Sequence, residues 1–235
     1  MIIDFHTHIL PGIDDGSKHL DMSIEMLSEE YDQGVDVVIA TPHFYASNTT
    51  LQKFLVDRDK AYRSITDKKL TGIPDILLGA EVAMFSRMDV AEDIELLCIE
   101  NTKTMLIEMP FRQWTDQDVR MLRNLLTRGI VPIIAHIERD LKYQRQKKFL
   151  EDILDLPLYV QVNAEGLNSW HIKRTLLDMF KNGFAHLLGS DCHNISSRKP
   201  NLLDGRKIIR RRIGDYQLDI IDNTGVRILG LQETR

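Results

Sequence analysis

The sequence predicts an α/β fold built on a parallel sheet that is closed or nearly closed. Short apolar runs rich in Ile and Val, which are typical of strands buried on both faces, recur along the chain. Helical patterns separate most of these runs, and such alternation favours parallel strands joined by crossovers. The 235 residues suit one α/β barrel or two small domains. Because no Pro/Gly-rich linker divides the chain, we expect residues 1–235 to form a single domain.

Each predicted element follows from a local pattern. Apolar runs predict strands over residues 2–5, 36–40, 76–79, 104–107, 131–135, 158–162 and 185–189. Residues 17–33 read as a helix with a possible N-cap at Ser17 and a stop at Gly34. Residues 115–129 and 170–182 read as two more helices.

Composition excludes several classes of function. The net charge is −5 and the sequence pI is about 5.9, so nucleic acid is not the expected partner. The basic run at 206–212 is interpreted as a solvated helix face, with docking of an acidic partner as the less favoured alternative. Two cysteines provide no disulfide framework, and the N-terminus lacks a signal-peptide pattern. We therefore expect a cytoplasmic protein without direct membrane insertion.

Polar residues follow nearly every predicted strand at its carboxyl end, and this observation favours a barrel over an open sheet. Barrel enzymes build their active sites at that face, where the loops after all strands converge. The residues concerned are His6, His8, His43, Glu81, Glu108, His136, Asp191 and His193.

Imidazoles and carboxylates are the nitrogen and oxygen ligands that Mn, Fe, Zn or Co accept. In the HTH motif, His6 and His8 lie two apart on a strand and point to the same face. Glu81 and Glu108 can each bridge two ions, and Asp15 is favoured over Asp14 as a further ligand. Several carboxylates in one pocket would repel one another, so two or three divalent cations are expected to neutralise them.

Other polar residues have plainer interpretations. Asp14 is read as a turn residue or as a residue that supports a ligand, and Asp4 as one that orients an imidazole. The role of Glu165 is left open. Three histidines away from strand ends are interpreted as surface or core residues: His19, His171 and His186.

Taken together, HTH, TPH (41–43), AHIER (135–139) and SDCH (190–193) resemble the PHP (polymerase and histidinol phosphatase) superfamily. Within it, HILPGIDDGS, IATPH, LIEMP and AHIER resemble the CpsB-type bacterial tyrosine phosphatases, which are encoded with capsule and exopolysaccharide genes. The resemblance runs from residue 1 to about residue 199. It implies a distorted seven-stranded (β/α)7 TIM-like barrel and a metal-dependent phosphatase.

The resemblance also implies a site with three metal ions, usually Mn. One ion would be held by His6, His8, Glu81 and Asp191, a second by Glu81, Glu108 and His136, and a third by Asp15, His43 and His193. Arg139 and Arg198 would bind the substrate phosphate, which belongs to phosphotyrosines on the tail of a bacterial tyrosine autokinase. Association between copies of the chain is left open.

Four alternatives remain at this point. Cys192 and Arg198 have the C-x5-R spacing of cysteine-dependent tyrosine phosphatases, although the intervening residues contain no glycine to cradle a phosphate. Histidinol phosphate or a phosphodiester could be the substrate of a metal enzyme. A non-catalytic metal-binding or kinase-docking module is the rival from another class.

Aromatic residues after two strands could stack against a tyrosyl ring. Phe44 and Tyr45 follow TPH and are the predicted substrate contacts. Phe111, Arg112 and Trp114 follow LIEMP. For both groups, core packing or surface exposure is the equal alternative.

Overall fold

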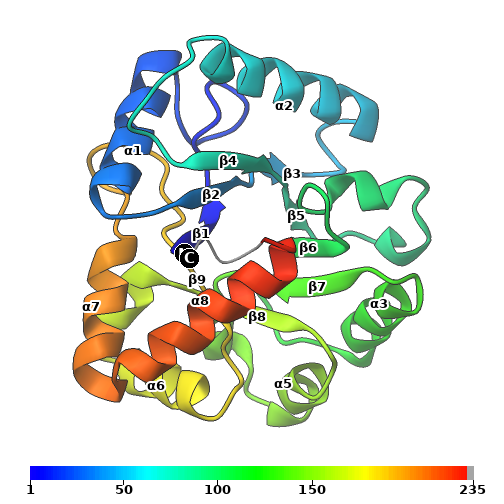
Figure 1. Ribbon diagram of the computed structural model, residues 1–235. Helices are drawn as coiled ribbons and strands as arrows, with labels where there is room; N and C mark the ends of the chain where they lie inside the picture. The colour runs from blue at the N-terminus through cyan, green and yellow to red at the C-terminus, as the bar shows by residue number, and fades with distance from the viewer. Residues whose placement is uncertain (232–235) are drawn as a thin grey trace.

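Parallel strands form a curled sheet surrounded by helices in the computed structural model, which describes residues 1–231 (Figure 1). All seven predicted strands are present, with small shifts at their ends. They are β1 (Ile3–Thr7), β2 (Val37–Ala40), β4 (Asp75–Leu78), β6 (Thr104–Glu108), β7 (Val131–Ile134), β8 (Tyr159–Asn163) and β9 (Leu187–Gly189).

Two further short strands, β3 (His43–Phe44) and β5 (Glu81–Ala83), continue β2 and β4 after a break. Pro42 helps to explain the break, because proline has no N–H for the ladder. The hydrogen-bonded orders are β1-β2-β4 and β3-β5-β6-β7-β8-β9, and a bridge between Thr7 and Cys192 connects the last strand back to the first. The predicted distorted barrel is therefore confirmed, with β2/β3 and β4/β5 each counting as one interrupted strand.

Helices cover the outside of the sheet. They are α1 (Leu20–Asp32), α2 (Leu51–Thr66), α3 (Asp116–Thr127), α4 (Ile137–Asp140), α5 (Lys147–Leu154), α6 (Lys173–Lys181), α7 (Leu202–Ile213) and α8 (Asp215–Leu229). No helix among residues 1–231 is both long and apolar enough to cross a membrane.

The predicted N-cap of the first helix is wrong. His19 caps α1 by accepting a hydrogen bond from the Met22 amide, and α1 begins at Leu20. Ser17 instead closes the preceding loop, because its N–H donates to the His8 carbonyl at 3.0 Å and its hydroxyl lies 2.8 Å from that of Ser23. Thr115, by contrast, caps α3 through a reciprocal capping box, as the sequence predicts.

Apolar side chains fill the barrel interior, and α8 covers one end of it. Val226 and Leu229 of α8 pack against Ile3 and Phe5 of β1. Gly225 allows this close approach, because a Cβ there would lie 2.8 Å from the Phe5 ring. Figure 1 shows α8 crossing the end of the barrel where the chain begins. The segment after residue 199, which carries no recognisable motif, thus closes the barrel opposite the polar strand ends.

The basic run was predicted to be a solvated helix face, and this is wrong for Arg206. Its side chain is buried and makes two parallel hydrogen bonds, of 2.6 and 2.8 Å, to Asp222 of α8. Arg210, Arg211 and Arg212 are exposed. The pair Arg206–Asp222 joins α7 to α8.

Candidate metal centre

Glu81 lies at the centre of the polar cluster at the carboxyl ends of the strands, and its side chain is buried. Its Oε2 atom is 3.1 Å from His6 Nε2, 3.2 Å from His8 Nε2 and 2.9 Å from His43 Nδ1. Its Oε1 atom is 2.7 Å from His136 Nε2. One carboxylate therefore contacts imidazoles delivered by three different parts of the barrel.

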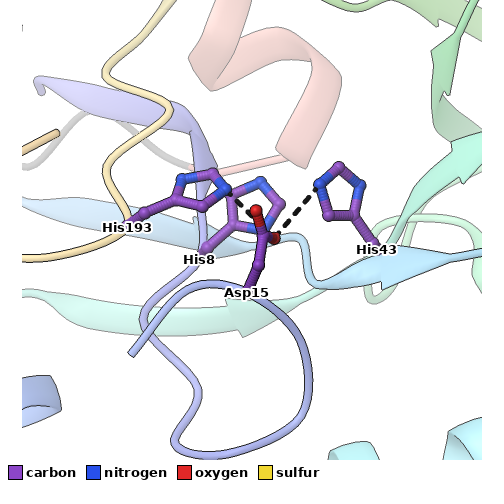
Figure 2. Close-up of side chains that lie close together, drawn as sticks. All are labelled: His8, Asp15, His43 and His193. Atoms are coloured by element: carbon purple, nitrogen blue, oxygen red, sulfur yellow. Dashed lines mark ion pairs between the residues drawn. The ribbon is translucent and has the colours of Figure 1, made fainter. Parts of the chain in front are cut away.

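A second group surrounds Asp15, which comes from the loop after β1 (Figure 2). Its Oδ1 atom lies 3.5 Å from His43 Nε2 and 3.4 Å from His193 Nε2. His8 joins this group, since its ring centroid is 3.9 Å from that of His193. The Asp15 side chain is exposed, so this group forms the outer part of the cluster.

Two more carboxylates complete the cluster. Glu108 Oε1 is 3.6 Å from His136 Nε2. Asp191 Oδ1 is 3.6 Å from His6 Nε2 and 3.5 Å from His8 Nε2. All nine residues predicted as ligands thus lie at one end of the barrel.

A β-bulge explains how β1 serves both the core and the site. The register of β1 against β2 shifts between Asp4 and Thr7. A bulge breaks the alternation of facing side chains. Phe5 and the next residue, His6, can therefore both face the barrel interior. Phe5 packs in the core, and His6 contributes to the polar cluster.

The chemistry and spacing of these side chains fit divalent metal ions. Ligand atoms within 4.8 Å of one another occur in three sets: His8, Asp15, His43 and His193; His6, His8 and Glu81; and His43, Glu81 and Glu108. Glu81 Oε2 and His193 Nε2 are buried atoms without a hydrogen-bond partner in the described structure. Such atoms are costly unless something binds them, and cations that accept N and O ligands would do so.

These sets differ in detail from those that the resemblance implies. His43, rather than His136, groups with Glu81 and Glu108, and His8 joins the group of Asp15. The ligand role of each residue remains a prediction.

The electrostatics differ from one group of the cluster to the next. Burial opposes a charge on His8, but its contacts with Asp14 and Glu81 raise the pKa of that imidazole to about 10. Burial would raise the pKa of Glu81, but the charge of His6 and the hydrogen bond from His136 hold that pKa well below its usual range. Burial and the charge of Glu81 raise the pKa of Glu108 to about 7. Burial and the charge of His8 lower the pKa of His193 to about 4. An imidazole with a lowered pKa is available as a neutral ligand near pH 7.

The two aspartates near the HTH motif have different roles. Asp14 orients the site, because its Oδ2 lies 2.7 Å from His8 Nδ1 and accepts a 3.0 Å hydrogen bond from the His43 amide. The prediction that Asp4 orients an imidazole is wrong. Asp4 accepts hydrogen bonds of 3.0 Å from the backbone N–H groups of His6 and Ser190, and so ties β1 to the end of β9.

Both predicted phosphate-binding arginines lie at the cluster. Arg139 of α4 contacts Asp191 Oδ2, and Arg198 Nη2 lies 2.8 Å from Asp191 Oδ1. Their side chains are 36% and 34% exposed, so both guanidinium groups reach solvent at the mouth.

The predicted aromatic contacts divide into core and site residues. Phe44 was predicted to bind substrate, and this is wrong: it is buried in the core against Phe54, at a ring distance of 5.2 Å. The Tyr45 hydroxyl lies 3.2 Å from His43 Nδ1, within the site. Phe111 is 47% exposed, and its ring centroid is 6.1 Å from that of His136. Trp114 is fully buried.

The residues that sequence reasoning missed are Gln161 and Asn163 on β8. Both are buried. Gln161 Oε1 accepts a 2.8 Å hydrogen bond from the His136 amide, and Asn163 Nδ2 donates a 2.9 Å hydrogen bond to Asp191. The available signal was the spacing in QVN, where two amides lie two apart on a strand, as the histidines do in HTH.

Cys192 is poorly suited to nucleophilic chemistry. It is fully buried, and its Sγ lies 3.7 Å from Glu30 Oε1. Burial and the charge of Glu30 raise the pKa of the thiol well above its usual range. A thiolate nucleophile needs the opposite environment, so the structure disfavours the cysteine-dependent alternative.

Comparison with known proteins identifies the family of the chain. Residues 2–229 match the family described as "Capsular polysaccharide synthesis, CpsB/CapC". A relative from Streptococcus agalactiae, the tyrosine-protein phosphatase CpsB, is 30% identical over 225 residues, covering 91% of each chain. The tyrosine-protein phosphatase YwqE of Bacillus subtilis is 28% identical and is covered over 85% of its length.

Solved structures show the same fold. One structure from a study of YwqE from Bacillus subtilis and CpsB from Streptococcus pneumoniae, described as unique metal-dependent tyrosine phosphatases, superposes with a TM-score of 0.82. It is 24% identical and covers 98% of this chain and 95% of its own. A phosphotriesterase homology protein from Escherichia coli has a TM-score of 0.56 at 13% identity. Given the family match over nearly its whole length, the chain belongs to the CpsB/CapC family.

Proposed function

We propose that this chain is a metal-dependent protein-tyrosine phosphatase that acts on phosphotyrosines in the tail of a bacterial tyrosine autokinase and so regulates capsular or exopolysaccharide synthesis in the cytoplasm. One observation carries the proposal. Buried imidazoles and carboxylates lie together at one barrel mouth, directly beside two partly exposed arginines. The names of the relatives support the tyrosine-phosphatase activity.

Three divalent ions, with Mn as the first candidate and Fe, Zn or Co as alternatives, would be held by the predicted residues. The proposed sets are His6, His8, Glu81 and Asp191; Glu81, Glu108 and His136; and Asp15, His43 and His193. When bound, such ions neutralise the carboxylates and lower the pKa of water enough to make hydroxide available near neutral pH.

Arg139 and Arg198 would bind the phosphate of the substrate. A planar guanidinium can meet two phosphate oxygens at once, and it remains charged at any working pH. Both arginines contact the single carboxylate of Asp191, which holds them at the edge of the cluster. Their positive charge would stabilise the charge that develops on the phosphoryl oxygens.

The wall of the site suits an aromatic substrate. Phe111 offers an exposed ring next to His136, and Tyr45 lies beside His43. Aromatic rings stack in offset or edge-to-face geometry, which would orient a tyrosyl ring. A phenolate leaving group, with a pKa of about 10, also needs less help from a general acid than an alkoxide.

The test compares substrates and metals directly. Purified protein should hydrolyse a phosphotyrosine peptide only with a bound divalent ion, with EDTA abolishing and Mn restoring turnover, while elemental analysis reports the metal content. Cys192→Ala should leave most of the activity.

Preference for histidinol phosphate would favour the superfamily alternative. Tight metal binding without hydrolysis of any phosphate ester would favour the non-catalytic docking module. The phosphorylated kinase tail should be preferred over unrelated phosphotyrosine peptides.

A further inference from the structure

The geometry points to Gln161 and Asn163 as a pair of positioning residues for the proposed metal centre. Their amides form one hydrogen-bonded chain that fixes the ring tautomer of His6 and the orientation of Asp191. The inference rests on the metal centre of the proposed function and adds residues that the ligand sets do not contain.

The chain of contacts runs through the barrel interior from β1 to the loop after β9. His6 Nδ1 lies 3.2 Å from Gln161 Oε1. Gln161 Nε2 donates to Asn163 Oδ1 at 2.8 Å, and Asn163 Nδ2 donates to Asp191 Oδ2 at 2.9 Å. Gln161 is fully buried and Asn163 is 2% exposed, so water does not compete for these bonds.

The direction of every bond in this chain is determined from its ends. The His136 backbone N–H donates to Gln161 at 2.8 Å, so the accepting atom is the amide oxygen. The other end of the Gln161 amide must then donate to the Asn163 oxygen. Asn163 is left with its NH₂ group facing Asp191, whose carboxylate accepts. No other arrangement satisfies all of these buried groups.

The tautomer of His6 follows from this direction. Because Gln161 Oε1 can only accept, His6 Nδ1 must carry the hydrogen. The lone pair of the neutral ring then lies on Nε2, which is the atom 3.1 Å from Glu81 Oε2. Orienting a ligand imidazole through its other nitrogen is the usual device in metal sites.

Two backbone features are linked to these hydrogen bonds. One leaves room for the Gln161 amide, and the other is held in place by it. A Cβ at Gly189 of β9 would lie 2.7 Å from both Gln161 Nε2 and His6 Cβ, so glycine leaves the space that the amide occupies. His136 has a positive φ of 29°, a conformation that residues other than glycine rarely adopt. Gln161 bonds the amide of that residue and thereby helps to hold it.

His8 provides a contrast within the same motif. Its Nδ1 lies 2.7 Å from the carboxylate of Asp14, at the outer side of the cluster. His6 lies deeper and uses a neutral amide instead. A carboxylate at position 161 would add charge beside Glu81 and Asp191, both of which are already buried anions. An amide orients the ring without that repulsion.

The experiment measures metal affinity and the tautomer rather than turnover. Gln161→Leu removes the acceptor and should weaken Mn binding by about 10- to 100-fold in a titration of free Mn followed by electron paramagnetic resonance. In the protein loaded with diamagnetic Zn, nitrogen NMR of labelled histidine should show the Nδ1–H tautomer of His6, with that N–H hydrogen-bonded in the wild type and without the hydrogen bond in the variant. Gln161→Glu keeps an acceptor and should retain that hydrogen bond.

Gln144→Leu is the matched control. Gln144 is also a buried amide, and its Oε1 accepts a 3.0 Å hydrogen bond from the Trp114 amide, away from the cluster. This variant should bind Mn as the wild type does. Wild-type Mn affinity in Gln161→Leu would overturn the inference. If that variant does not fold, loss of the His6 hydrogen bond in Gln161→Glu would overturn it equally. Absence of phosphatase activity would count only against the proposed function, because neither readout depends on turnover.

Discussion

Arginine and aspartate side chains meet in two groups at opposite ends of the barrel. The two groups contain the same residue types but differ in structure. Arg206 and Asp222 join α7 to α8 as one cation and one anion, with side chains 10% and 18% exposed. At the mouth, Arg139 and Arg198 share the single carboxylate of Asp191 and are about twice as exposed or more. In the pair that joins the helices, one positive charge is matched by one negative charge. At the mouth, two guanidinium groups share one carboxylate and reach solvent, where they can meet a phosphate.

The mouth also contains features that cost stability. Asp191 has a positive φ of 54°, and both carboxylate oxygens of Asp140 are buried without a hydrogen-bond partner in the described structure. Neither feature occurs in the Arg206–Asp222 pair. Strain and unmatched polar groups cluster at functional sites, because binding geometry there outweighs stability. The following variants test this division.

Arg198→Ala should have the largest effect on catalysis. Loss of one group that stabilises transition-state charge typically lowers kcat about 100- to 1000-fold, or about 3–4 kcal/mol. The thermal midpoint should change little, because the side chain is partly exposed. Steady-state kinetics on a phosphotyrosine peptide and thermal unfolding measure the two effects. A variant with wild-type kcat/KM would remove Arg198 from the site.

Arg206→Ala should show the reverse pattern. It leaves Asp222 partly buried and unpaired, so the free energy of unfolding should fall by about 3 kcal/mol while kcat/KM stays near the wild-type value. Arg210→Ala, on the same helix, is the control. Arg210 pairs with Asp215 at side-chain exposures of 58% and 71%, and such a surface pair contributes about 0–1 kcal/mol. Equal losses in urea unfolding for both variants would contradict the comparison.

Phe111→Ala tests whether the mouth binds an aromatic ring of the substrate. Loss of an aromatic stacking partner is expected to raise KM for a phosphotyrosine peptide about tenfold, equivalent to about 1–1.5 kcal/mol. A small phosphate ester without a ring should be affected less. Tyr216→Ala on α8, where the ring is 78% exposed, serves as the control and should leave KM unchanged.

Asp140→Asn tests the stability cost through its pH dependence, with the smallest expected effect. Burial and the charge of Glu138 raise the pKa of Asp140 from 3.8 to about 8. The folded state therefore favours the protonated acid, and stability from this group is lost as the pH rises from about 4 to about 8. The variant should unfold about 2–4 °C higher than the wild type at pH 8, equivalent to roughly 1 kcal/mol. It should show no gain at pH 4, and an equal gain at both values would refute the explanation.

The sequence by itself determined the strand–helix order and the end of the barrel at which the site lies. Periodicity predicts strands well when they are buried on both faces, as for residues 131–135. It predicts the site because the carboxyl ends of parallel strands must meet. The motifs that resemble CpsB-type phosphatases lie at these carboxyl ends.

Only the tertiary structure decided which polar groups face one another. Phe44 is a core residue while Tyr45 lies at His43, because neighbouring residues on a short strand point to opposite sides. Arg206 is buried because α8 brings Asp222 to it, a contact between segments that no local pattern encodes. The links from Gln161 and Asn163 to the site were hidden for the same reason: an amide takes its role from its hydrogen-bond partners, and folding alone brings those partners together.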